Sequence, residues 1–74
     1  MRIQVNGEYQ EVAEGTTLEE LIALFSFASD RIAIEHNGLV VRRIDWSTVR
    51  LEEGDRVEIV HFVGGGFWKF ELSY

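Results

Sequence analysis

The chain has 74 residues, a formal net charge of −6, 46% hydrophobic residues and no cysteine. This length and hydrophobic content predict one small globular domain, and the absence of cysteine excludes internal disulfides, thiolate metal sites and a cysteine nucleophile. The acidic charge argues against nucleic acid or an anionic membrane as a partner and favours a partner with a basic face, although solubility alone would also explain it. No apolar signal segment follows Met1 and no apolar run could span a bilayer, so we expect a soluble, cytoplasmic protein.

The chain opens with a predicted β-hairpin. Residues 2–5 alternate polar and apolar side chains, which is typical of a half-buried strand. Asn6-Gly7 is a strong signal for a tight hairpin turn, and residues 9–12 supply the return strand.

A helix is predicted next. Thr17 and Glu20 have the spacing of a capping box, in which each side chain bonds the backbone N–H of the other residue. Apolar residues then recur at helical spacing and predict a helix from about Leu18 to Phe25, with its apolar stripe across a sheet. These apolar residues are Leu18, Leu21, Ile22 and Phe25.

The middle of the chain predicts a second hairpin and a short helical turn. Residues 32–34 are apolar and partly β-branched, Asn37-Gly38 marks a tight turn, and residues 39–41 form the return strand. Residues 44–48 show neither period clearly, and we expect a short helical turn there with Trp46 packed inward.

The last predicted strand covers residues 56–63 and follows a turn at residues 53–55. The resulting order, β-β-α-β-β-β, predicts an α+β protein of the β-grasp (ubiquitin-like) class. It would have a mixed four- to five-stranded sheet with one main helix packed across it. In this arrangement the first and last strands pair in parallel at the sheet centre, which suits the dense apolar pattern of the last strand. Residues 1–63 would form the domain.

Three glycines, Gly64, Gly65 and Gly66, follow this strand directly. Glycine has no side chain and wide backbone freedom, so residues 64–66 would form a thin, flexible arm that reaches about 10 Å when extended. Such an arm could enter a channel too narrow for a side chain. A terminal glycine carboxylate, once activated as an acyl-adenylate, would be open to attack by a sulfur nucleophile. Taken alone, three glycines also fit a linker or a turn.

Four segments together resemble the ThiS family, the sulfur carriers of thiamin thiazole biosynthesis. They are residues 3–8, residues 17–21, residues 34–41 and residues 54–66. The last segment, in which Val-Glu-Ile-Val-His-Phe-Val runs into glycines, is the most specific. The resemblance covers residues 1–66, nearly the whole chain.

The resemblance implies a cycle in which the protein is a cosubstrate and not an enzyme. An E1-like adenylyltransferase would use ATP and Mg to adenylate the terminal glycine. A sulfur donor such as a cysteine desulfurase would convert it to a thiocarboxylate, and a thiazole synthase would accept the sulfur. The carrier itself would bind no metal or cofactor. Related carriers that serve molybdopterin, cysteine or methionine synthesis remain alternatives.

Residues 67–74 depart from the family pattern, in which chains end at the glycines. An amide-linked Gly66 has no free carboxylate, so the chain as written cannot be adenylated there. We favour a precursor that a protease cleaves after Gly66, with Gly65 as the alternative terminus. The other interpretations are an added, non-native segment, or a β-grasp interaction module without acyl chemistry. The alternation in residues 68–74 is compatible with a short strand that adds to the sheet, or with a disordered end.

Three residues of the last strand are candidates for partner docking: Glu58, His61 and Phe62. Glu58 belongs to an acidic group close in sequence to the base of the arm, which could meet arginines on an activating enzyme or simply be solvated. The group is Glu52, Glu53, Asp55 and Glu58.

Other side chains give weaker signals. His36 and His61, the two histidines, are poor evidence for a metal site without cysteines or a fixed spacing. Phe25 and Phe27 would seal the end of the helix or offer an apolar patch to a partner. No nucleophile–base pair indicates an enzyme.

Overall fold

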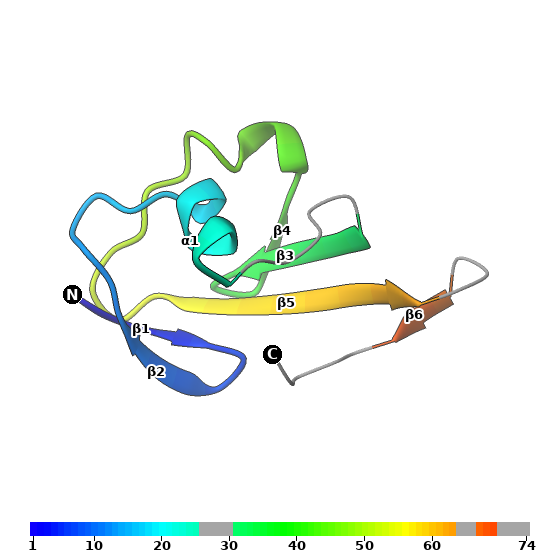
Figure 1. Cartoon of the computed structure of the whole chain (residues 1–74), viewed down its shortest axis with the longest axis horizontal. Coiled ribbons are helices and arrows are strands. Elements are labelled where there is room, and N and C mark those ends of the chain that lie inside the picture. Colours follow the sequence, from blue (N-terminus) through cyan, green and yellow to red (C-terminus); the bar gives the residue numbers. More distant parts are fainter. Residues whose placement is uncertain (26–30, 64–66, 70–74) are drawn as a thin grey trace.

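The computed structural model describes residues 1–25, 31–63 and 67–69 (Figure 1). It contains strands β1 (Arg2–Val5), β2 (Glu8–Glu11), β3 (Ile32–His36), β4 (Leu39–Val41), β5 (Arg56–Val63) and β6 (Phe67–Lys69), with helix α1 (Leu18–Phe25) and the short 3-10 helix η2 (Arg43–Asp45). The sheet has the order β2-β1-β5-β3-β4, and β6 pairs with β5. Helix α1 lies across one face of the sheet. The predicted α+β β-grasp arrangement is confirmed, with β6 as an additional strand.

The two predicted Asn-Gly turns are confirmed by their backbone angles. Asn6 and Gly7 have φ values of 50° and 85°, and Asn37 and Gly38 have values of 51° and 88°. Positive φ at both central residues defines the turn type that matches the twist of paired strands. The pairs β1–β2 and β3–β4 are antiparallel, whereas β1 and β5 are parallel through Val5 and Val57, as predicted for the centre of the sheet.

The capping box at the start of α1 is also confirmed. The Thr17 N–H donates to Glu20 Oε1 at 2.9 Å, and the Glu20 N–H donates to Thr17 Oγ1 at 3.1 Å. Two of the backbone N–H groups that a helix start leaves unpaired are therefore satisfied locally. The helix runs from Leu18 to Phe25, as the apolar spacing predicted.

The core lies between α1 and the inner face of the sheet. Trp46 follows η2, is 4% exposed, and donates its Nε1–H to the Val41 carbonyl at 3.0 Å, which confirms the predicted inward packing. The other buried members of the core are Ile3, Val5, Leu18, Leu21, Ile22, Ile32, Ile34, Leu51, Val57 and Ile59. This cluster extends in sequence from Ile3 to Ile59.

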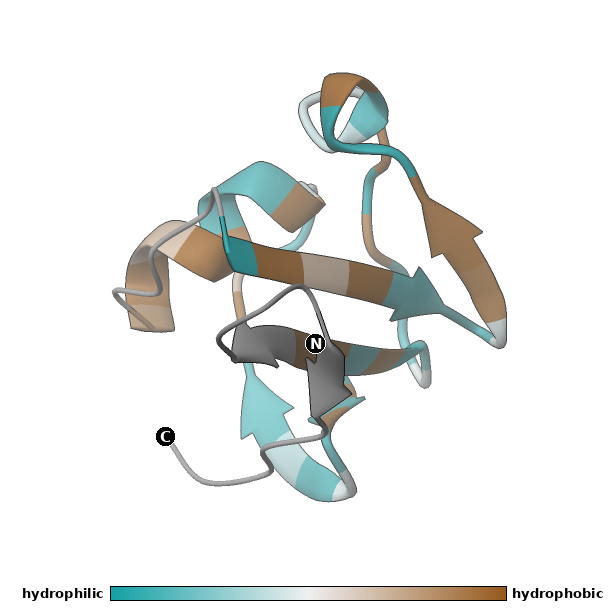
Figure 2. Ribbon diagram, turned by 90° about the vertical axis from the view of Figure 1, so that its right-hand side faces the viewer, coloured by the Kyte–Doolittle hydropathy of each residue, from teal (hydrophilic) through white to brown (hydrophobic). Residues whose placement is uncertain are grey.

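The two edges of the sheet differ in polarity. Figure 2 shows a hydrophilic β2 at one edge and a hydrophobic β4 at the other. On β4, Leu39 and Val40 are exposed. Among the described residues, no helix has the length and apolar character needed to cross a membrane.

Candidate functional site

Strand β5 connects the rigid part of the protein to the glycines. It runs from Arg56 to Val63 along the long dimension of the molecule and extends past β1 toward β6 (Figure 1). Its neighbours change along its length. Parallel β1 pairs with it at Arg56 and Val57, β3 pairs with it from Val57 to His61, and β6 pairs with it from His61 to Val63.

The two sides of β5 can be assigned from its backbone hydrogen bonds. The Arg56 carbonyl accepts from the Asn37 N–H at 2.8 Å, on the β3 side, and the Val57 carbonyl accepts from the Asn6 N–H at 2.9 Å, on the β1 side. Backbone groups of successive strand residues point to alternate sides. Because β3 and β6 both pair with His61, they lie on opposite sides of β5. Strand β6 therefore follows β1 along the same side.

Asn6 ends the β1 ladder with its side chain. Its Oδ1 accepts the Ile59 N–H at 2.7 Å, so an amide side chain replaces the next backbone partner of β5. Its Nδ2 is buried and has no hydrogen-bond partner among the described residues. The sequence predicted Asn6 only as a turn residue. Its contact with a residue 53 positions away could not be read from the local pattern.

The predicted docking residues lie along β5. Glu58 is exposed, stands opposite Glu35 in the register, and lines a shallow hollow of about 170 Å³ with Glu35, Gly38 and Arg56. His61 and Phe62 take part in strand pairing, and their side chains lie outside the part of the chain that the structure describes.

The predicted arm, Gly64, Gly65 and Gly66, lies outside the described residues. The described strands on either side of it pair antiparallel, with Val63 opposite Phe67. Of the two alternatives for residues 68–74, the short strand is therefore confirmed for Trp68 and Lys69, and this strand begins one residue earlier, at Phe67. Residues 70–74, the rest of the predicted strand, lie outside the described part.

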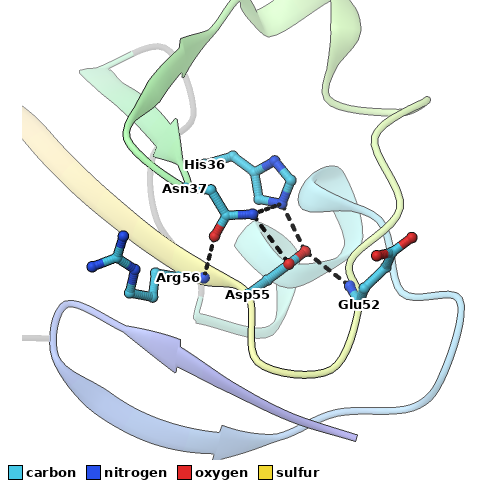
Figure 3. A network of polar contacts seen from close by, with 5 residues as sticks. All are labelled: His36, Asn37, Glu52, Asp55 and Arg56. Atoms are coloured by element: carbon cyan, nitrogen blue, oxygen red, sulfur yellow. Dashed lines mark hydrogen bonds and ion pairs between the residues drawn. The ribbon is translucent and has the colours of Figure 1, made fainter.

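At the opposite end of β5, Asp55 is the centre of a polar network (Figure 3). Its carboxyl group is 2.7 Å from His36 Nε2, and it accepts bonds from Asn37 Nδ2 at 3.1 Å and from the Glu52 N–H at 2.9 Å. Asn37 Oδ1 also accepts the Arg56 N–H at 2.8 Å. Asp55 is only 9% exposed. This network joins the β3–β4 turn to the loop that precedes β5.

The pKa of Asp55 reflects two opposing effects. Burial raises the pKa of the carboxyl group because it disfavours the charged form. Hydrogen bonds from His36, the Glu52 N–H and Asn37, together with the charge of His36, favour the carboxylate and outweigh burial, so the pKa of Asp55 lies below its usual value of 3.8. Asp55 therefore serves as an internal acceptor and not as a solvated surface charge.

The acidic group that is close in sequence to the arm is spread along the length of β5 and the loop before it. Eight strand residues from Arg56 to Val63 span about 26 Å at a rise of roughly 3.3 Å per residue, so Glu52 and Asp55 lie far from Val63, the last residue before the arm. Asp55 is buried, and the Glu53 carboxylate accepts the Arg2 N–H at 2.9 Å.

The strand register separates the two histidines. The register places His36 opposite Val57 and His61 opposite Ile32, at the two ends of the β3–β5 pairing. Within the described residues there is no group of three or more histidine, aspartate or glutamate side chains that could hold a metal ion. Phe25 is half-buried against the core, whereas Phe27 lies outside the described residues.

Comparison with known proteins connects this arrangement to one family. The sequence matches the ThiS family over residues 3–66, a match that ends at the last glycine. The crystal structure of the thiamine biosynthesis protein ThiS from Geobacter metallireducens is 35% identical and has a TM-score of 0.79, covering 89% of this chain and all of that one. The sulfur carrier protein ThiS of Bacillus subtilis is 32% identical over 65 residues, covering 86% of this chain and 98% of its own length.

A different kind of relative is much longer. A thiazole synthase of Magnetococcus marinus is 46% identical over 66 residues, covering 89% of this chain. The chain spans only 20% of the length of that thiazole synthase. The family match and the structural likeness agree with the resemblance read from the sequence and with the β-grasp fold. The chain belongs to the ThiS family.

Proposed function

We propose that this protein is a sulfur carrier whose Gly66, once residues 67–74 are removed, becomes a thiocarboxylate that donates sulfur for thiamin thiazole synthesis. One observation carries the proposal. The family match ends at Gly66, the third glycine after the central strand β5. In this proposal residues 1–63 are the folded domain, residues 64–66 are the arm and residues 67–74 are the removable extension.

The described geometry supports an arm with a fixed base. Val57 and Ile59 of β5 are 0% and 1% exposed and pack in the core, and Asp55 is held by hydrogen bonds just before the strand. A rigid strand delivers a short arm to a partner in a defined direction, which reduces the conformational freedom lost on binding. Glycines without side chains then allow close approach to the terminal carbonyl.

The chemistry needs a free carboxylate and an activating partner. The Gly66 carboxylate would attack ATP, release pyrophosphate and form an acyl-adenylate, and a sulfur nucleophile would then displace AMP. ATP and Mg belong to the E1-like adenylyltransferase, and a cysteine desulfurase is the proposed source of sulfur. The carrier contributes the reactive terminus and its own docking surface, for which Glu58, His61 and Phe62 are the candidates.

Thiazole synthase is the proposed acceptor of the sulfur. A thiazole synthase that contains a region similar to this chain as a fifth of its length supports this pathway over molybdopterin, cysteine or methionine synthesis. A processing protease completes the set of partners, and the cytoplasm is the proposed compartment. The alternative is an interaction module without acyl chemistry, which the pairing of β6 with β5 favours because it integrates the extension into the sheet.

Intact mass measurement tests the proposal. Protein from the native cell should end at Gly66, and a fraction should be heavier by about 16 Da because sulfur replaces oxygen. In vitro, the chain that ends at residue 66 should release pyrophosphate with the adenylyltransferase and ATP.

Matched chains that end at residues 65 and 74 are the controls. The 74-residue chain should not react. Faster reaction of the 65-residue chain would move the terminus to Gly65. If the native protein retains all 74 residues and none of the three chains reacts, the carrier function is excluded and the interaction module is favoured.

A further inference from the structure

The side of β5 next to the arm has backbone groups that β1 does not reach. On this side β1 pairs as far as Val57, and the Asn6 side chain takes the Ile59 N–H. By alternation, His61 and Val63 are the next residues whose backbone groups point to this side. Within the described residues, these two positions pair with β6, through Lys69 and Phe67. Three residues of the extension therefore occupy the edge that β1 leaves open.

The chain cannot cover this edge by lengthening β1. Asn6 and Gly7, with φ values of 50° and 85°, turn the backbone into β2, away from the end of β5. Asn6 Nδ2 adds an unused donor at the junction, because it is buried without a partner among the described residues. When residues 67–74 leave, β5 becomes an open strand edge beside the terminal glycines. Unpaired strand edges readily accept an extended segment of another chain.

We infer that the backbone edge of β5 at His61 and Val63 is a strand-addition site for an extended segment of the adenylyltransferase, and that β6 occupies it until residues 67–74 are removed. The choice of partner rests on the proposed function, since the adenylyltransferase must enclose the arm that starts after Val63. Cleavage then has two effects, because it creates the carboxylate and it exposes the docking edge next to it.

The short length of β6 suits a removable strand. Three residues make few main-chain hydrogen bonds, and the loss of conformational freedom on ordering them offsets much of the gain. The buried cluster between α1 and the sheet is formed by residues from Ile3 to Ile59, and the family match covers residues 3–66, so the chain that ends at residue 66 retains this cluster and every described strand except β6. The truncated chain can therefore be tested on its own.

Amide hydrogen exchange tests the edge directly. In the 74-residue chain the His61 and Val63 amides should be protected, and in the 66-residue chain they should exchange at least tenfold faster. Lys69→Pro removes a β6 backbone donor and should give the same increase in the full chain, whereas Ser73→Pro, beyond β6, should not. The Ile34 and Ile59 amides report that each variant is folded. Equal protection of His61 and Val63 in the 66- and 74-residue chains would overturn the inference.

Two probes then test the occupant. A synthetic peptide of residues 67–74, added to the 66-residue chain, should restore protection of the His61 and Val63 amides. The adenylyltransferase should protect the same amides, and the peptide should weaken its binding at least severalfold.

If the enzyme adenylates the 66-residue chain while these amides still exchange freely in the complex, the strand-addition site is wrong and the carrier function stands. If the peptide binds but no adenylation occurs, the edge is confirmed as a strand-binding site and the assignment of the adenylyltransferase as its occupant is wrong.

Discussion

The two ends of β5 are held in different ways. At its start, the Asp55 carboxyl group takes contacts from His36, Asn37 and Glu52, and the Asp55 carbonyl accepts the Gln4 N–H at 2.9 Å. At its end, Val63 is held by main-chain pairing with Phe67 of the extension. Side-chain networks and buried residues fix the first end, whereas the pairing at the second end disappears when the extension is removed. This contrast suits a protein that must present a releasable terminus from a fixed base.

The largest expected loss of stability comes from a substitution at the start of β5. Asp55→Ala should lower the free energy of unfolding by about 3 kcal/mol, because the Asn37 amide, the His36 ring and the Glu52 N–H lose a buried acceptor together. Urea denaturation measures this loss. Glu58→Ala, at an exposed position of the same strand, is the control and should change stability by less than about 0.5 kcal/mol. Equal losses in the two variants would contradict the contrast.

Substitution of Asn6 should cause an intermediate loss of stability. Asn6 lies between the part of β5 that pairs with β1 and the part that pairs with β6. Asn6→Ala removes the acceptor of the Ile59 N–H and places a Cβ-bearing residue without a local hydrogen bond at φ 50°, which should cost about 2 kcal/mol. Asn6→Gly keeps the turn and loses only the acceptor, so about 1 kcal/mol is expected. Thermal or urea unfolding of both variants separates the two contributions. If Asn6→Gly is as stable as the parent, the contact with Ile59 does not contribute.

A smaller effect should appear on acidification. The hydrogen bonds of Asp55 hold its pKa below the usual 3.8 although burial opposes them. A carboxyl group with a lowered pKa in the folded state contributes stability above its unfolded pKa and loses it as pH falls through the folded pKa. The stability advantage of the parent over Asp55→Asn, taken at about pH 5 as the reference, should therefore shrink as the pH falls below about 4. A difference that grows with acid would indicate a raised pKa.

The smallest change in stability is expected at the end of β5, where residues 67–69 pair with it. Removal of residues 67–74 should change the free energy of unfolding by no more than about 1 kcal/mol, because the hydrogen bonds of a three-residue strand are nearly offset by the cost of ordering it. Urea denaturation of the 66- and 74-residue chains measures the difference. A loss as large as that of Asp55→Ala would mean that the extension is part of the folded core.

The sequence alone was sufficient wherever a few neighbouring residues decide the structure. The Asn6-Gly7 and Asn37-Gly38 turns, the Thr17–Glu20 capping box and the apolar stripe of α1 depend on backbone preferences and contacts within one or two turns, so their patterns predicted them. The glycine run after the last apolar strand was equally visible, because its position in the chain order is local information.

Tertiary structure decided which of the similar-looking polar residues are internal. Asp55 looks like its neighbours Glu52 and Glu53 in the sequence, but its carboxyl group meets Asn37, 18 residues earlier, inside the fold. Asn6 meets Ile59 across 53 residues, and β6 takes the side of β5 that β1 leaves open. Such contacts depend on which strands the sheet brings together. Residue type and spacing specify the strands, and the packing of the whole sheet specifies their neighbours.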